Sequence, residues 1–124
     1  MNERPLVLVA DDDADILNLV TLRLERDGYE VVGASDGELA VEKALDRPPD
    51  LALIDVSMPK LDGYEVAERL RAHEPTSTIP IILLTARVQD SDVARGVAAG
   101  ADDYVKKPFS TADLRTRVQA ALGR

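Results

Sequence analysis

The sequence predicts an α/β fold with a doubly wound, five-stranded parallel sheet, and three observations support this prediction. Apolar runs of four to five residues alternate with helical patterns of 10 to 14 residues, and this happens five times. Three of the runs are almost wholly apolar, as expected for strands covered on both faces. Four of the runs lead into polar residues, which places functional groups at one edge of the sheet.

The apolar runs define five expected strands. The run at 30–34 is weaker than the others, which favours a position at the edge of the sheet. The expected strands are residues 6–10, 30–34, 51–54, 80–84 and 103–105.

A helix is expected after each strand. The first ends at the glycine signal Asp27-Gly28. The second begins at Ser35 and the third at Asp62, because each stands three residues before a glutamate in a capping-box pattern. The first helix has four apolar residues at helical spacing: Ile16, Leu19, Val20 and Leu24.

The last two helices differ in their expected stability. The fourth, near 90–99, contains Gly96 and ends in Ala-Ala-Gly, so it should be the loosest. The fifth begins at Ser110 and ends at Leu122-Gly123. One domain over residues 1–124 is therefore expected.

Composition narrows the function classes. The 45% apolar and 31% charged content is typical of a globular chain. The absence of cysteine excludes thiolate metal sites and fits a reducing cytoplasm, and no apolar run is long enough to predict a membrane segment. A net charge of −8, scattered basic residues and few aromatics argue against direct nucleic-acid binding. We therefore expect a cytoplasmic protein without membrane or nucleic-acid contacts.

The polar residues at the strand ends predict the functional site. The carboxyl ends of parallel strands share one edge of the sheet, where open α/β sheets bind ligands. Carboxylates, a hydroxyl and an ammonium gathered there suit a divalent cation and a phosphoryl group. The residues concerned are Asp11, Asp12, Asp13, Asp55, Thr85 and Lys107.

The acidic residues each have two interpretations. The three carboxylates of Asp11–Asp13 would repel one another unless a cation such as Mg²⁺ neutralises them. The run could also be an acidic helix start. Asp13 or Asp15 is expected to serve that start. Asp55 could be a metal ligand, a nucleophile or both, or a simple turn residue. The pattern Asp55-x-x-Met-Pro-x-x-Asp-Gly favours a functional role.

The other two strand-end groups are less specific alone. Thr85 could donate its hydroxyl to a phosphoryl oxygen while Ala86 leaves room for it, or it could be an ordinary strand residue. Lys107 could pair with Asp55 or with a phosphoryl group, or it could be a solvated surface charge. The bond from Lys107 to Pro108 is a candidate for the cis form.

Taken together, the motifs resemble the receiver domain of bacterial two-component response regulators, over the whole chain. The intervals of 30 residues from Asp55 to Thr85 and 22 from Thr85 to Lys107 suit that family. The motifs that carry the resemblance are Asp11-Asp12, the segments 55–63 and 100–109, and Thr85-Ala86. The resemblance implies a flavodoxin-like strand order, 2-1-3-4-5.

The resemblance also implies the role of each site residue. Asp55 would take a phosphoryl group from a sensor histidine kinase or a phosphotransfer protein. Mg²⁺ or Mn²⁺ would be held by Asp12 directly, by Asp11 through water, by Asp55 and by the backbone carbonyl of Ser57. Lys107 would contact the phosphoryl group.

A switch follows by the same resemblance. Thr85, beside Ala86, would move to hydrogen-bond the phosphoryl group, and Tyr104 would swing inward behind it. The face formed by the fourth helix, fifth strand and fifth helix would then control a downstream partner or output domain. Ser57 and Arg87 occupy the positions that tune phosphoryl lifetime. Neither is a carboxamide or a carboxylate that would orient an attacking water, so slow to moderate self-dephosphorylation is expected.

The same face bears on assembly. Asp103 and Arg117 could keep one charge pair of the dimer common among these receivers, but Val93 and Ala98 replace the expected charges on the fourth helix. A monomer or weak dimer is therefore expected. Val93 and Val97 would contact another partner or face the core.

Two other classes of protein share parts of this pattern. A haloacid-dehalogenase-type phosphatase also uses an aspartate, Mg²⁺ and a lysine, but its motif needs Thr or Val at position 15, where this chain has Asp15. A degenerate receiver serving as a scaffold lacks support, because every expected site residue is present. The chain should thus phosphorylate itself on Asp55 without being a turnover enzyme.

Overall fold

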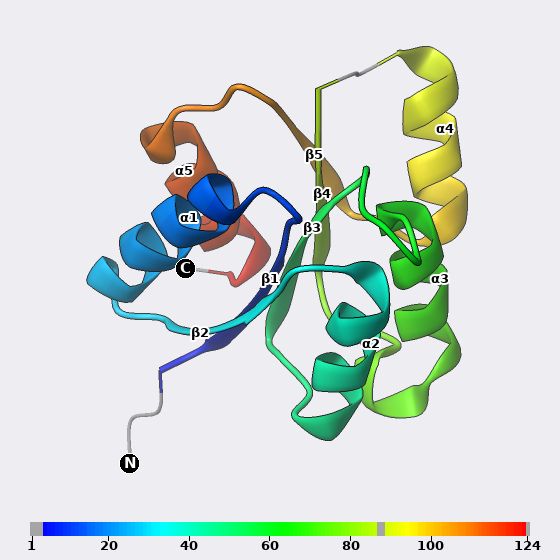
Figure 1. Ribbon diagram of the computed structural model, residues 1–124, viewed down its shortest axis with the longest axis horizontal. Coiled ribbons are helices and arrows are strands. Elements are labelled where there is room, and N and C mark those ends of the chain that lie inside the picture. The colour runs from blue at the N-terminus through cyan, green and yellow to red at the C-terminus, as the bar shows by residue number, and fades with distance from the viewer. Residues whose placement is uncertain (1–3, 87–88, 124) are drawn as a thin grey trace.

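The computed structural model describes residues 4–86 and 89–123 (Figure 1). Strands and helices alternate along this part of the chain, as the sequence predicts, with one short 3-10 turn at Glu74–Thr76. The elements are β1 (Leu6–Ala10), α1 (Ala14–Arg26), β2 (Glu30–Ala34), α2 (Gly37–Asp46), β3 (Leu51–Asp55), α3 (Gly63–Ala72), β4 (Ile81–Thr85), α4 (Asp90–Ala99), β5 (Asp103–Lys106) and α5 (Thr111–Ala121).

The five strands form one parallel sheet in the order β2-β1-β3-β4-β5. This confirms the predicted fold class and strand order, and it places the weak strand β2 at an edge. Figure 1 shows α1 and α5 on one face of the sheet and α2, α3 and α4 on the other. The sheet is therefore doubly wound.

Two apolar clusters form the core, one on each face. On the α2–α4 face, Leu8 and Ile54 of the central strands pack with Leu70 of α3. On the α1–α5 face, Val9 and Leu53 pack with side chains that include Leu24 and Leu114 of the two helices. Alternate residues of β1 and β3 thus point to opposite faces, which explains why these strands are apolar throughout.

Strands β3, β4 and β5 each extend one residue further than predicted, and β4 begins one residue later. The reason is that the ladder continues through the polar residues: Asp55 pairs with Leu84, and Thr85 pairs with Lys106. Asp55 and Thr85 are therefore the last residues of their strands, not the first residues of loops.

Three predicted helix starts are confirmed. The Asp13 carboxylate accepts hydrogen bonds from the backbone of Asp15 and Ile16. Asp62 forms the expected capping box at the start of α3, and Ser110 caps α5. Asp13 thus serves the helix.

The predicted start of the second helix at Ser35 is wrong by one residue. The cap is Asp36, whose carboxylate accepts the backbone N–H of Leu39 at 2.8 Å. Packing decides this register, because α2 begins with Gly37 against the backbone of Leu61, where no side chain would fit. The backbone N–H of Gly37 also donates to the carbonyl of Pro59.

Helix α4 covers the predicted residues, and its exposed side settles one alternative. Val93 and Val97 are 37% and 67% exposed, so they do not lie in the core. Gly100 ends the helix with a φ of 102°, a left-handed conformation that favours glycine. Its carbonyl accepts hydrogen bonds from the guanidinium of Arg71, which also contacts Ile79. The C-terminal end of α4 is thereby tied to α3.

In the described part of the chain, no helix has the length and apolar character needed to cross a membrane.

Candidate functional site

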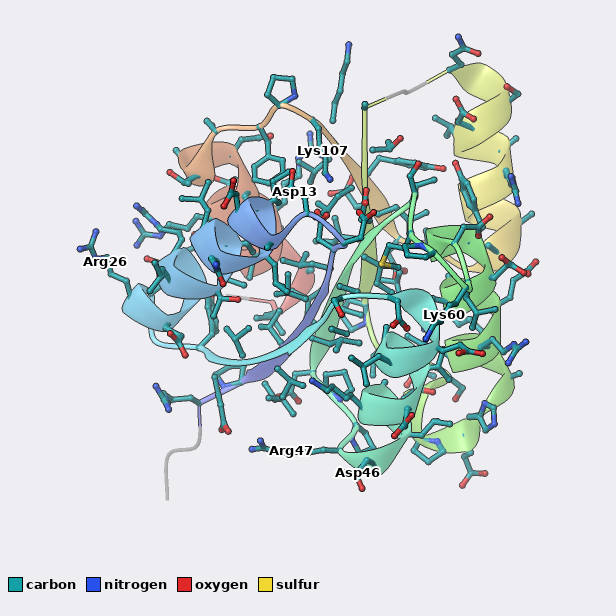
Figure 2. All side chains as sticks on the ribbon, viewed as in Figure 1. Asp13, Arg26, Asp46, Arg47, Lys60 and Lys107 are labelled. Carbon is teal, nitrogen blue, oxygen red and sulfur yellow. The ribbon has the colours of Figure 1, made fainter. Side chains whose placement is uncertain are left out.

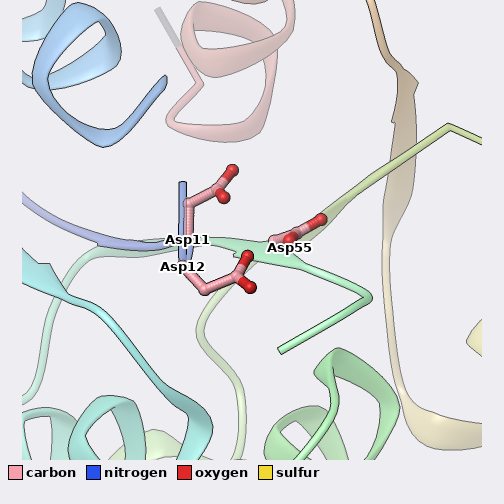
Figure 3. A group of neighbouring side chains, drawn as sticks. All are labelled: Asp11, Asp12 and Asp55. Atoms are coloured by element: carbon pink, nitrogen blue, oxygen red, sulfur yellow. The ribbon is translucent and has the colours of Figure 1, made fainter. Parts of the chain in front are cut away.

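Three carboxylates meet where β1 and β3 end. One ligand atom from each of Asp11, Asp12 and Asp55 lies within 4.8 Å of the other two (Figure 3). Asp11 is fully buried and Asp55 is 5% exposed, whereas Asp12 faces solvent. The predicted acidic cluster is therefore confirmed in position, with Asp13 turned to the helix start.

Lys107 joins two of these carboxylates. Its Nζ lies 2.9 Å from Oδ2 of Asp11 and 3.2 Å from Oδ1 of Asp55. Figure 2 shows Lys107 at the same end of the sheet as Asp13, opposite Asp46 and Arg47. The Lys107–Pro108 bond is cis, as anticipated. The pairing with Asp55 was predicted, but the pairing with Asp11 was not.

The charges of the site act strongly on Asp55. Burial raises its pKa to about 6, and the charge of Asp11 acts in the same direction. Lys107 opposes both effects without cancelling them. For Lys107 itself, burial would lower the pKa, but the hydrogen bond to Asp11 and the charge of Asp55 prevail and raise it. The site therefore holds a carboxylate whose ionised form is destabilised in the absence of a further positive charge.

Thr85 lies at the adjoining strand end. It is 7% exposed, and its backbone carbonyl accepts the N–H of Lys107 at 2.7 Å. Thr85 and Ala86 line a pocket together with Ser57 and side chains of α3 and α4. Arg87, the second position expected to tune phosphoryl lifetime, lies outside the described residues.

Tyr104 is half-buried on the edge strand β5, as its predicted position implies. Its hydroxyl lies 3.2 Å from the hydroxyl of Tyr64 and also donates to the backbone carbonyl of Asp92 in α4. Its ring packs on Gly96, where a side chain would collide with it. Sequence reasoning missed Tyr64, because no pattern along the chain links a residue of α3 to one of β5.

Asp103 and Arg117, which the sequence suggests for a charge pair between two copies, form an ion pair with each other within one chain, at 2.8 Å. Arg117 also donates to the backbone carbonyl of Tyr104 at 3.0 Å. This guanidinium therefore lies along the outer edge of β5.

A doubly wound sheet with buried carboxylates and a lysine at its carboxyl edge defines an α/β protein with a charged site at that edge. The chain belongs to the family described as response regulator receiver domain, which it matches over residues 7–119. The haloacid-dehalogenase alternative is accordingly not favoured.

Known proteins agree with this assignment. The alkaline phosphatase synthesis transcriptional regulatory protein PhoP of Bacillus subtilis is 46% identical over 124 residues, covering all of this chain and 50% of that protein. This chain therefore spans about half the length of that relative. Chemotaxis protein CheY4 of Vibrio cholerae has a similar structure, with a TM-score of 0.94 and 32% identity, over 97% of this chain and 100% of that one.

A third relative bears on metal binding. The receiver domain of sensor histidine kinase PA1611 from Pseudomonas aeruginosa has a TM-score of 0.90 and 33% identity, over 98% of this chain and 100% of that one. That structure has a magnesium ion coordinated in its active site cleft.

Proposed function

We propose that Asp55 accepts a phosphoryl group from a sensor histidine kinase or a phosphotransfer protein. The observation that carries the proposal is the placement of Asp55, buried at the carboxyl edge of the sheet between Asp11 and Lys107. A phosphoryl group adds about −1.5 to −2 charge and three acceptor oxygens at that point. Lys107 supplies a positive charge for it, and Thr85 and Ala86 border the same edge.

The donor set fits a hard divalent cation. Three carboxylates with ligand atoms within 4.8 Å, one of them with its pKa raised to about 6, suit Mg²⁺ or Mn²⁺. Asp11, Asp12, Asp55 and the backbone carbonyl of Ser57 would hold the ion. When bound, the ion neutralises charge that develops on the transferring phosphoryl group.

The signal would leave the site through Thr85 and Tyr104. Thr85 reaches the phosphoryl oxygens, Tyr104 follows, and the α4-β5-α5 face changes its affinity for a partner or output domain. Val93 and Val97 are exposed on α4 and are candidate contacts. This cycle is a single self-phosphorylation and self-dephosphorylation, without turnover of a substrate.

The partners follow from the family. The relative from Bacillus subtilis is a transcriptional regulatory protein about twice as long as this chain. We infer that this receiver unit, residues 1–124, works in the cytoplasm as a monomer or weak dimer. With a net charge of −8, it would leave any DNA contact to another domain.

Incubation with acetyl phosphate and Mg²⁺, followed by intact-mass measurement, tests the phosphoacceptor. The wild type should gain one phosphoryl group, and Asp55→Asn should gain none, because the amide cannot form the acyl phosphate. Asp13→Asn is the matched control: it keeps a good capping side chain next to the site and should be labelled as the wild type is. An adduct in Asp55→Asn, or none in the wild type with several small phosphodonors, would contradict the proposal.

The lifetime of the phosphoryl group is a separate prediction. Ser57 and Arg87 carry neither a carboxamide nor a carboxylate to orient an attacking water, so self-dephosphorylation should be slow to moderate. Decay of the adduct after removal of acetyl phosphate measures it. A half-life of seconds would show that another group orients the water.

A further inference from the structure

Three side chains from α3, α4 and β5 meet beside the proposed phosphoacceptor site. They are Tyr64, Arg95 and Tyr104. We propose that Tyr64 is a positioning residue of the switch, which links α4 to the phosphoacceptor strand through α3 and Tyr104. The inference rests on the proposed function and names a regulatory residue for it.

The first step of this route is the contact between α3 and the end of β3. The backbone N–H of Gly63 donates to the carbonyl of Val56 at 2.9 Å. A Cβ atom at Gly63 would lie 2.6 Å from the carbonyl oxygen of Asp55, so no space separates α3 from the phosphoacceptor backbone. Tyr64 is the next residue of the helix. A displacement of the Asp55 backbone must therefore also displace the start of α3, where Tyr64 lies.

The second step is the fixed position of the Tyr64 side chain. Tyr64 is 4% exposed. The guanidinium of Arg95 lies 4.3 Å from the centre of its ring, an attractive cation–π geometry. Arg95 also pairs with Asp62, the residue that caps α3, at 3.4 Å. Arg95 of α4 thus contacts both the ring of Tyr64 and the capping residue of α3.

The third step is the bond between the two tyrosine hydroxyls, which lie 3.2 Å apart. Tyr104 has a single hydroxyl proton, and the carbonyl of Asp92 can only accept, so Tyr64 supplies the proton between the two hydroxyls. Burial raises the pKa of Tyr104, so the Tyr104 hydroxyl keeps its proton for the bond to Asp92.

The last step joins Tyr104 to α4. Its hydroxyl is bonded to the backbone of Asp92, and its ring lies against Gly96, one turn further along the helix. Helix α4 therefore rests on Tyr104, and Tyr104 is bonded to Tyr64. Strand β4 is joined to β5 through the backbone ladder, in which Thr85 pairs with Lys106.

Amide exchange of residues 90–99 tests the contact in the unphosphorylated protein. Loss of one hydrogen bond in Tyr64→Phe should speed exchange of α4 about 2-fold to 10-fold. The effect should vanish when Tyr104 is already phenylalanine, because the partner hydroxyl is gone. Tyr29→Phe is the control, since Tyr29 is also buried but belongs to the cluster on the opposite face. Equal α4 exchange in Tyr64→Phe and Tyr29→Phe, or additive effects in the double variant, would overturn the proposal.

A second measurement separates the route from simple packing. It compares α4 exchange before and after labelling with acetyl phosphate and Mg²⁺, in samples whose mass shows the adduct. Tyr64→Phe should reduce the phosphorylation-dependent change in α4 exchange, whereas Tyr29→Phe should keep it in full. An equal change in the two variants would refute the route. If Asp55 takes no phosphoryl group, the proposed function fails, and the unphosphorylated comparison still decides whether Tyr64 holds α4.

Discussion

Replacing Gly63 by alanine is expected to destabilise the protein by about 3 kcal/mol, at the upper end of the range for overpacked sites. An added Cβ would lie 2.6 Å from the carbonyl oxygen of Asp55 and 2.8 Å from Cα of Val56. Both atoms belong to backbone that is paired in the sheet or hydrogen-bonded to Gly63 itself. Neither can move aside without disturbing those hydrogen bonds. The loss of stability should appear as a lower midpoint of urea unfolding, with an unchanged dependence of the free energy of unfolding on urea concentration.

The same substitution should also impair labelling of Asp55 by acetyl phosphate, because relief of the clash must displace either α3 or the phosphoacceptor backbone. Gly33→Ala is the matched control. There the three nearest atoms to an added Cβ would belong to the flexible side chain of Leu17, the first of them at 3.4 Å. It should be neutral or stabilising by up to about 1 kcal/mol. Equal stability of the two variants would show that α3 is free to shift away from β3.

In the metal-free protein, Asp55→Asn is expected to raise the stability near neutral pH. The pKa of Asp55 is raised from 3.8 to about 6, which corresponds to roughly 3 kcal/mol. The pKa of Asp55 is higher in the folded state than in the unfolded state. The protonated carboxyl group therefore contributes fully to folding stability below its ordinary pKa, and this contribution is lost as pH rises through about 6. The ionised wild-type site is therefore strained at neutral pH, mainly by burial and the charge of Asp11.

Urea unfolding of both proteins in EDTA across pH measures this effect. At about pH 7.5 the asparagine variant should be the more stable by up to roughly 3 kcal/mol, and the gap should close towards about pH 4, where Asp55 is protonated. Added Mg²⁺ should narrow the gap at the higher pH, because it binds the folded wild type better than a variant that lacks one ligand. A gap that does not vary with pH would mean that Asp55 is not the group under strain.

The sequence predicted the strands and most helix starts well, because these depend on neighbours in the chain. The apolar runs and the capping pattern at Asp62 are local signals, and the structure follows them. The start of α2 was missed by one residue for the opposite reason. Both Ser35 and Asp36 can cap a helix, and the choice is made by the contact of Gly37 with Leu61, 24 residues away.

A similar limit applies to Gly96. Along the chain it indicates a weak helix, and this remains its effect on local propensity. In the fold it is also the only residue type that leaves room for the ring of Tyr104 against α4. That role depends on how α3, α4 and β5 pack, so it has no sequence signature.

The sequence by itself determined the fold class, the strand order through family resemblance, and the identity of the residues at the carboxyl edge of the sheet. It could do so because parallel strands bring their ends together whatever the details of packing. Only the tertiary structure decided how those residues meet: Lys107 bridges Asp11 as well as Asp55, and Tyr104 is bonded to Tyr64. These contacts span tens of residues and depend on distances of a few ångströms, which are set by the packing of helices against the sheet.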